Sequence, residues 1–179
     1  GTDSLSPSRD SFSNDSRRGS VLDKRNSVRN SIEDHELNFI KVAQLLQTIT
    51  NFDFNIFELN EYMGKKALYY LTNAIFENLE IDYLYDPDKC KNFLMAIAKG
   101  YDRKVQYHND IHAADVLQTA FVMLYHGQVK ERLNLQDVDI LGVLLASACH
   151  DFKHPGQNNI YNINTKSNLA IRYNGISTL

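Results

Sequence analysis

Apolar residues recur at steps of three and four along most of this chain, which is the period of an α-helix with one buried face. The pattern begins near Glu33. Its stripes contain Leu37, Ile40, Val42, Leu45, Leu46 and Ile49, then Leu68, Leu71, Ile75 and Leu79, then Phe93, Leu94, Ile97 and Ala98. No segment alternates apolar and polar residues as a half-buried strand does, and no hairpin turn is evident. The sequence therefore predicts an all-α fold.

Several helix boundaries can be predicted from local signals. Asp86 is a good capping residue and Pro87 suits the first helical position, so a helix should begin there. Gly100 suits the end of that helix. Two further helices are expected over residues 110–126 and 135–149, the first of them stopped by a glycine.

Composition and charge narrow the class of protein. A hydrophobic content of 43% in 179 residues is enough for one compact domain or for one piece of a larger one. The net charge of −3 argues against nucleic acid as a partner. The longest apolar run, 140–149, is about half of the roughly 20 residues that a membrane span needs. Cys90 and Cys149 show no metal-binding or redox spacing, so reduced thiols in a cytoplasmic protein are expected.

Two short segments depart from ordinary helix composition. In the first, His108 and His112 are four residues apart, so both should project from one face of a helix that opens there. In the second, His150 and Asp151 follow directly on the most apolar helix. That helix should deliver both side chains deep into the fold.

An aspartate buried beside a histidine is costly unless a cation satisfies its charge. Imidazole and carboxylate together suit zinc or a similar ion, and a carboxylate can bridge the two cations of a hydrolytic site. Each segment alone is weak, because a histidine pair at this spacing is more often on the surface or in helix packing. The combination favours a metal-dependent hydrolase.

The two segments together resemble the catalytic domain of class I 3′,5′-cyclic nucleotide phosphodiesterases. The matching residues are Tyr107-His108-Asn109, His112-Ala113, Asp115-Val116, His150-Asp151, His154-Pro155-Gly156 and Asn159, within a similarity that spans about Phe52 to Leu179. The resemblance implies a multi-helical bundle of the His-Asp metal-dependent phosphohydrolase type. It also implies hydrolysis of cAMP or cGMP to 5′-monophosphates in signal transduction.

The resemblance implies roles for four residues at the expected site. His112, His150 and Asp151 match the ligands of a first metal ion, and Asp151 also reaches a second ion. The first ion in this family is usually zinc, and the second is usually magnesium or manganese. His108 matches the general acid that protonates the departing 3′ oxygen.

Four neighbouring positions also matter for the resemblance. Tyr107 matches a residue of the substrate pocket, and His154 and Asn159 match residues that bind water or contact the metal ligands. Lys153 departs from the acidic or small residue expected there. Its side chain either points to solvent or weakens binding of the second ion.

The resemblance further implies that residues 32–179 are the N-terminal part of a truncated domain. Another metal-binding aspartate and a purine-binding glutamine would follow Leu179, and the chain has no initiator methionine. We therefore expect a fragment that is inactive, or nearly so, when expressed alone.

Residues 1–31 form a leader of different composition. They contain nine serines and a single aromatic residue, so they are predicted to be disordered. Basic residues precede Ser20 and Ser27 at the spacing favoured by cAMP-dependent protein kinase, and phosphate there would reverse a net positive charge. The alternative is that a Ser/Arg-rich segment matches such patterns by chance.

Two other functions are alternatives to a cyclic nucleotide phosphodiesterase. Another His-Asp metal phosphohydrolase, such as a nucleotidase, would share the ligands but has no reason to carry Tyr107-His108-Asn109. A non-catalytic helical module regulated by a kinase would not need intact metal ligands. Metal analysis separates the module from both enzymes.

Overall fold

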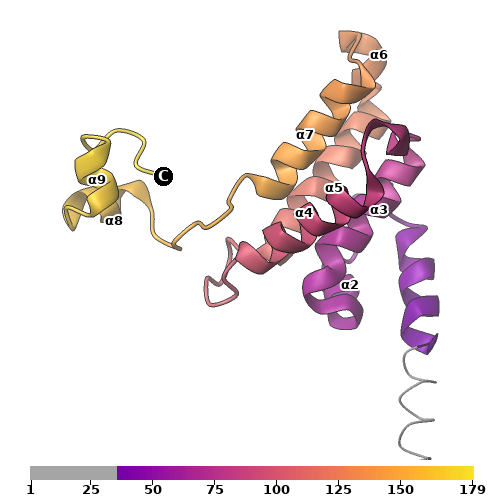
Figure 1. Ribbon diagram of the computed structural model, residues 1–179, viewed down its shortest axis with the longest axis horizontal. Helices are drawn as coiled ribbons and strands as arrows, with labels where there is room; N and C mark the ends of the chain where they lie inside the picture. Colours follow the sequence, from indigo (N-terminus) through magenta and orange to yellow (C-terminus); the bar gives the residue numbers. More distant parts are fainter. Residues whose placement is uncertain (1–35) are drawn as a thin grey trace, which may run out of the picture. The chain divides into compact units, whose positions relative to one another are not determined.

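A computed structural model describes residues 36–179, which contain helices and turns and no strand (Figure 1). The prediction of an all-α fold is confirmed. The predicted leader, with Ser20 and Ser27, lies outside the described residues, so its kinase sites stay predictions. Contacts between Cα atoms divide the chain into residues 1–40 and 41–179. Only the helical residues 36–40 of the first unit are described.

The second unit begins with helical residues 41–46 and continues through a series of helices. These are α2 (Ile56–Met63), α3 (Ala67–Asn78), α4 (Pro87–Gly100), α5 (Asp110–Gly127), α6 (Val129–Leu133), α7 (Asp137–Cys149), α8 (Asn159–Asn164) and α9 (Asn168–Arg172). Two short 3₁₀ helices, η1 (Gly64–Lys66) and η2 (Asp82–Leu84), lie between them. No helix within residues 36–179 has the length and apolar character needed to cross a membrane.

The predicted start of α4 is confirmed. Pro87 is its first residue, and the Asp86 side chain accepts a hydrogen bond from the backbone N–H of Lys89. The helices expected over 110–126 and 135–149 are α5 and α7, although α7 begins two residues later than predicted. The α5 helix does end at its glycine, but the left-handed residue that follows is Gln128, with φ of 50°.

Helix α5 lies at the centre of the core and packs mainly against α3 and α7 (Figure 1). Its buried residues include Ala113, Ala114, Leu117, Phe121 and Val122, and those of α7 are Ile140, Leu144 and Ala148. Full burial of each large apolar side chain contributes about 1.5–3 kcal/mol. Because only the short α6 separates them, α5 and α7 run antiparallel, and the start of α5 lies beside the end of α7.

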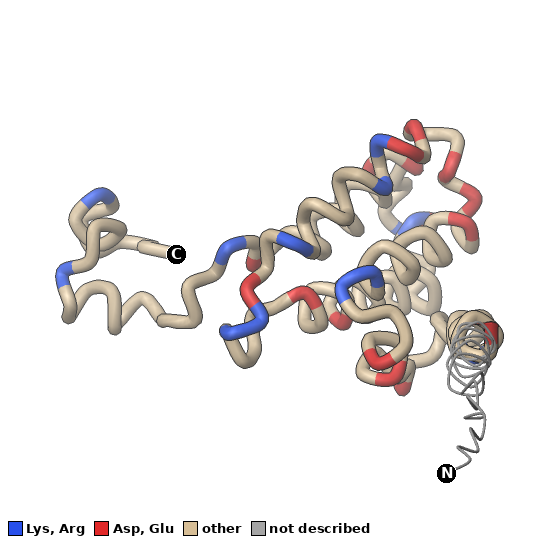
Figure 2. Tube along the Cα trace, turned by 60° about the horizontal axis from the view of Figure 1, so that its bottom comes forward, with Lys and Arg blue, Asp and Glu red and all other residues tan. Residues whose placement is uncertain are grey.

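The chain beyond α7 differs in charge from the rest. Figure 2 shows Lys and Arg, and no Asp or Glu, on the trace that follows Asp151. The basic residues are Lys153, Lys166 and Arg172. This segment therefore has a net positive charge in a chain that is negative as a whole.

Candidate metal centre

Asn109 joins the loop that carries His108 to the first turn of α5. Its side-chain oxygen accepts hydrogen bonds from the N–H groups of Ile111 (3.0 Å) and His112 (3.3 Å). Its amide group donates to the carbonyls of Val105 (3.2 Å) and Gln106 (3.1 Å). The residue therefore satisfies groups on both sides of the helix start, as an N-cap does.

The helix start corrects one sequence prediction. His108 precedes the cap and lies in the loop, whereas His112 lies in the first turn of α5. The two histidines therefore do not share a helix face, although their ring centroids are only 5.9 Å apart. The predicted start near Asp110 was right, but a helix face shared with His108 would need the helix to begin before its Asn109 cap.

We expect Asn109→Ala to lower the free energy of unfolding by about 1–2 kcal/mol, because helix N–H groups lose their acceptor. Urea denaturation of the 179-residue chain measures this. Asn109→Asp is the matched control, since it keeps the capping oxygen and should lose less stability. Equal midpoints for the alanine variant and the parent chain would contradict this role.

His150 caps the C-terminus of α7, and its tautomer can be assigned from its partners. Its Nδ1 lies 2.8 Å from the carbonyl oxygen of Ser147, which can only accept, so Nδ1 carries a hydrogen. Its Nε2 faces Oδ2 of Asp151 at 3.0 Å. In a neutral imidazole this places two lone pairs opposite each other, an arrangement that requires a proton or a cation between them.

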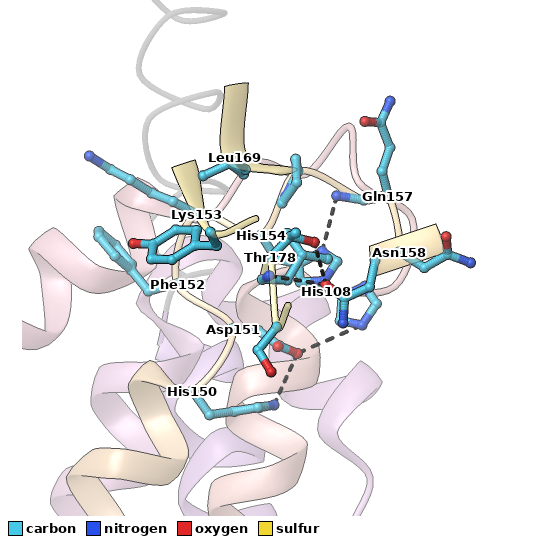
Figure 3. A pocket seen from close by; sticks show the side chains of 16 residues that line it. His108, His150, Asp151, Phe152, Lys153, His154, Gln157, Asn158, Leu169 and Thr178 are labelled. Atoms are coloured by element: carbon cyan, nitrogen blue, oxygen red, sulfur yellow. Dashed lines mark hydrogen bonds and ion pairs between the residues drawn. The ribbon is translucent and has the colours of Figure 1, made fainter. Parts of the chain in front are cut away.

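Three imidazoles converge on one oxygen of Asp151. Figure 3 shows two of them, His108 and His150, with dashed lines to the carboxylate. Besides the contact with His150, Oδ2 lies 3.4 Å from Nε2 of His112 and 3.9 Å from Nε2 of His108. These side chains come from the 101–109 loop, from α5 and from the end of α7. The antiparallel packing of the two helices brings them together.

Two overlapping groups of side chains could each hold a metal ion. The first is His112, His150 and Asp151, and the second is His108, Asp151 and His154; within each, the ligand atoms lie within 4.8 Å of one another. Asp151 belongs to both groups. The His154 ring also stacks on the His108 ring, with centroids 3.9 Å apart. A carboxylate in this position can bridge two ions.

Burial and neighbouring imidazoles favour the neutral form of two of these histidines. Burial lowers the pKa of His112, and the nearby charge of His150 lowers it further. Burial, followed by the charge of His108, lowers the pKa of His154. Both rings are therefore neutral near pH 7, which is the form that binds a metal ion.

The prediction that His150 and Asp151 lie deep inside the fold is wrong. Their side chains are 35% and 18% exposed, and they line an open pocket of about 970 Å³. The reason is helical rotation, because each residue advances by about 100°. Position 150 therefore points about 200° away from Ala148, the last residue of the buried face of α7.

Three other predicted residues have different surroundings. Tyr107 is exposed, but its ring centroid lies 4.3 Å from that of His112. Asn159 lines the open pocket, yet its side-chain oxygen accepts hydrogen bonds from Thr178 Oγ1 (2.6 Å) and from the last backbone N–H (3.0 Å). Lys153 is exposed, and its Nζ lies 5.6 Å from the centre of the Phe152 ring.

Tyr101 supports the site and was missed in the sequence. It is 1% exposed, and its hydroxyl donates to the carbonyl oxygen of Ala148 at 3.1 Å, which joins the start of the loop to the end of α7. Burial raises the pKa of Tyr101 to about 12. Its ring also meets Phe152 edge to face, with centroids 5.9 Å apart. Only a continuation of the apolar stripe beyond Gly100 could have indicated it.

The part of the chain that contains the candidate metal centre is also the part that is similar to known proteins. The sequence profile of the family described as 3′5′-cyclic nucleotide phosphodiesterase matches residues 107–179. A 3′,5′-cyclic-AMP phosphodiesterase 4 of Dictyostelium discoideum is 36% identical over 139 residues, which are 75% of this chain. The match covers 13% of the length of that protein. The matched profile begins at Tyr107 and therefore contains both groups that could hold a metal ion.

Proposed function

Since residues 107–179 belong to the 3′5′-cyclic nucleotide phosphodiesterase family, we propose that this protein hydrolyses 3′,5′-cyclic nucleotides to 5′-monophosphates. The observation that carries the proposal is the convergence of His108, His112 and His150 on Asp151. Three imidazoles around one carboxylate form a donor set for a divalent cation.

The ligand set that we propose for a first ion, zinc, is His112, His150 and Asp151. Its fit rests on the donor set, because the Nδ1 hydrogen of His150 is donated to Ser147, which leaves Nε2, 3.0 Å from the Asp151 carboxylate, as the atom that can bind a shared cation. Asp151 would also reach a second ion, magnesium or manganese. When bound, such a pair of ions supplies an activated water and neutralises phosphoryl charge.

The role that we propose for His108 is that of general acid. Its side chain is 33% exposed towards the pocket, so a substrate can reach the ring. The carboxylate of Asp151 faces its Nε2, and the stacked ring of His154 limits its rotation. As water adds to phosphorus and the bond to the 3′ oxygen breaks, His108 gives its proton to that oxygen.

The charge of the surrounding chain supports an anionic substrate. The segment after Asp151 has three basic residues and no acidic residue (Figure 2). A cyclic nucleotide has one negative charge on its phosphodiester, so this segment attracts it. The name of the Dictyostelium relative makes cyclic AMP the first substrate to test.

Product analysis tests the proposed function. The purified protein is supplied with zinc and magnesium, incubated with cyclic AMP or cyclic GMP, and its products are separated by chromatography. The proposal predicts 5′-AMP or 5′-GMP, and it predicts that a chelator stops the reaction. Release of inorganic phosphate from mononucleotides, with cyclic nucleotides left intact, would instead identify a nucleotidase.

We expect the isolated 179-residue chain to hydrolyse cyclic AMP at a small fraction of the rate of a longer active form. Its site is open, because His108 and His150 are each about one third exposed. Charge stabilisation is far weaker in contact with bulk water than in a closed site. A radiolabelled assay measures the residual rate. Full turnover by these 179 residues would contradict the expectation.

A further inference from the structure

An ion pair joins Arg103, which is partly exposed, to the buried Asp110, and Asp110 lies between His108 and His112 in the sequence. Arg103, in the loop, donates from Nε to Oδ1 of Asp110 at 2.8 Å and from Nη2 to Oδ2 at 2.6 Å. The same Nη2 donates to the side-chain oxygen of Asn60 in α2 at 2.7 Å. Arg103 therefore connects the loop, the start of α5 and α2.

Both partners of the Arg103–Asp110 ion pair are chemically specific to it. The Asp110 side chain is only 2% exposed, and a buried carboxylate must be paired to be tolerated. The two parallel hydrogen bonds of a guanidinium fix both distance and orientation, which a lysine cannot do. The hydrogen bond with Asp110 also raises the pKa of Arg103, so the cation is permanent.

The Arg103–Asp110 pair lies next to the candidate metal centre in the sequence. Asp110 lies two residues after His108 and two residues before His112, and it is the first residue of α5. Both of its oxygens are taken by Arg103, and it belongs to neither metal-binding group. The pair thus fixes the backbone between two imidazoles while it keeps a nearby carboxylate away from the ion.

We propose that Arg103 is a positioning residue, which acts through Asp110 to hold His108 and His112 at the spacing that lets both reach Asp151. The proposal deepens the proposed metal centre and rests on it. Loss of Arg103 leaves the buried Asp110 carboxylate unpaired and should lower stability, but the Asn109 cap and the Tyr101 hydroxyl still hold the loop, and removing Asp110 as well relieves the unpaired charge. The effect specific to positioning should be on metal affinity, measured under conditions in which the variants are folded.

A Co²⁺ titration of the 179-residue chain, read by visible absorption, tests the proposal. We expect Arg103→Ala and Arg103→Lys each to weaken Co²⁺ binding about 10- to 100-fold, as loss of a supporting contact does at metal sites. Lys104→Ala is the control, since it removes the adjacent exposed charge and should bind Co²⁺ as the parent chain does. Unchanged affinity in both Arg103 variants, or an equal loss in the control, would overturn the proposal.

A double variant and a second readout separate positioning from stability. If Arg103 acts through Asp110, the Arg103→Ala/Asp110→Ala variant should bind Co²⁺ no more weakly than the worse single variant. Additive losses would contradict this. A parent chain that binds no Co²⁺ would defeat the proposed metal centre, and hydrogen exchange would then decide the role of Arg103. Arg103→Ala must speed exchange at the amides of residues 111–113 relative to those of α7; unchanged exchange there would refute the proposal.

Discussion

Replacing His108 with alanine, in a form of the protein that hydrolyses cyclic nucleotides, should remove most of the activity and leave the metal content unchanged. A positioned general acid contributes roughly 10²–10⁴ in rate, so kcat should fall by that factor. The ring is well placed for this role, because it faces the open pocket and is held by the stacked ring of His154. Initial rates and elemental analysis of the same sample measure both effects.

His126→Ala is the matched control for His108→Ala. His126 lies near the end of α5. Its ring contacts the carbonyl oxygen of Thr50, and it belongs to neither group that could hold a metal ion. It should retain full turnover. If His108→Ala instead loses one of two bound ions, His108 is a metal ligand together with His154. Near-normal turnover would remove His108 from the mechanism altogether.

Replacing Asp151 with asparagine should abolish binding of both ions. Loss of a residue that only supports a ligand costs about 10- to 100-fold in metal affinity, and loss of a shared ligand should cost more. Inductively coupled plasma mass spectrometry of the dialysed protein measures the bound metal. Asp88→Asn, which changes an exposed acid at the start of α4, is the control and should bind metal normally.

The same Asp151 variant should not destabilise the metal-free protein. An asparagine amide can donate to Nε2 of His150, which faces a carboxylate oxygen at 3.0 Å in the parent chain. Urea denaturation in the presence of a chelator should therefore give an equal or higher midpoint. Retained zinc in this variant, or a large loss of stability without metal, would contradict the assigned ligand.

Long helices could be predicted from the sequence because their stabilisation is periodic. The buried face of α4 and its start at Asp86 and Pro87 follow from local signals. The short helices α6, α8 and α9 were missed, since five or six residues cannot show a stripe. Helix α9, for example, is capped by Ser167, whose side chain accepts a hydrogen bond from the N–H of Ala170. A serine by itself does not predict a helix, so this cap could not be identified from the sequence.

Gly100 shows how a correct boundary can have a different cause. The sequence favoured it as a residue that ends a helix. In the structure it is the last residue of α4, and an added Cβ would lie 2.2 Å from the Phe152 ring. Its lack of a side chain therefore also permits close packing against a residue 52 positions later, which no local signal could reveal.

The residues of the candidate site could be named from the sequence more easily than their surroundings. Two segments that depart from helix composition drew attention to His108, His112, His150 and Asp151, and the family resemblance implied which of them are ligands. The exposure of His150 depended on rotation past the end of α7. The pairing of Arg103 with Asp110 depended on how the loop folds back, and two opposite charges seven residues apart give no helical signal.

The central claim is that His112, His150 and Asp151 bind one common ion. Crystals of the protein grown with zinc and measured at the zinc absorption edge test this most directly. We predict an anomalous peak about 2.0–2.2 Å from Nε2 of both histidines and from an oxygen of Asp151. A peak bound by other side chains, or no peak near these three, would contradict the claim.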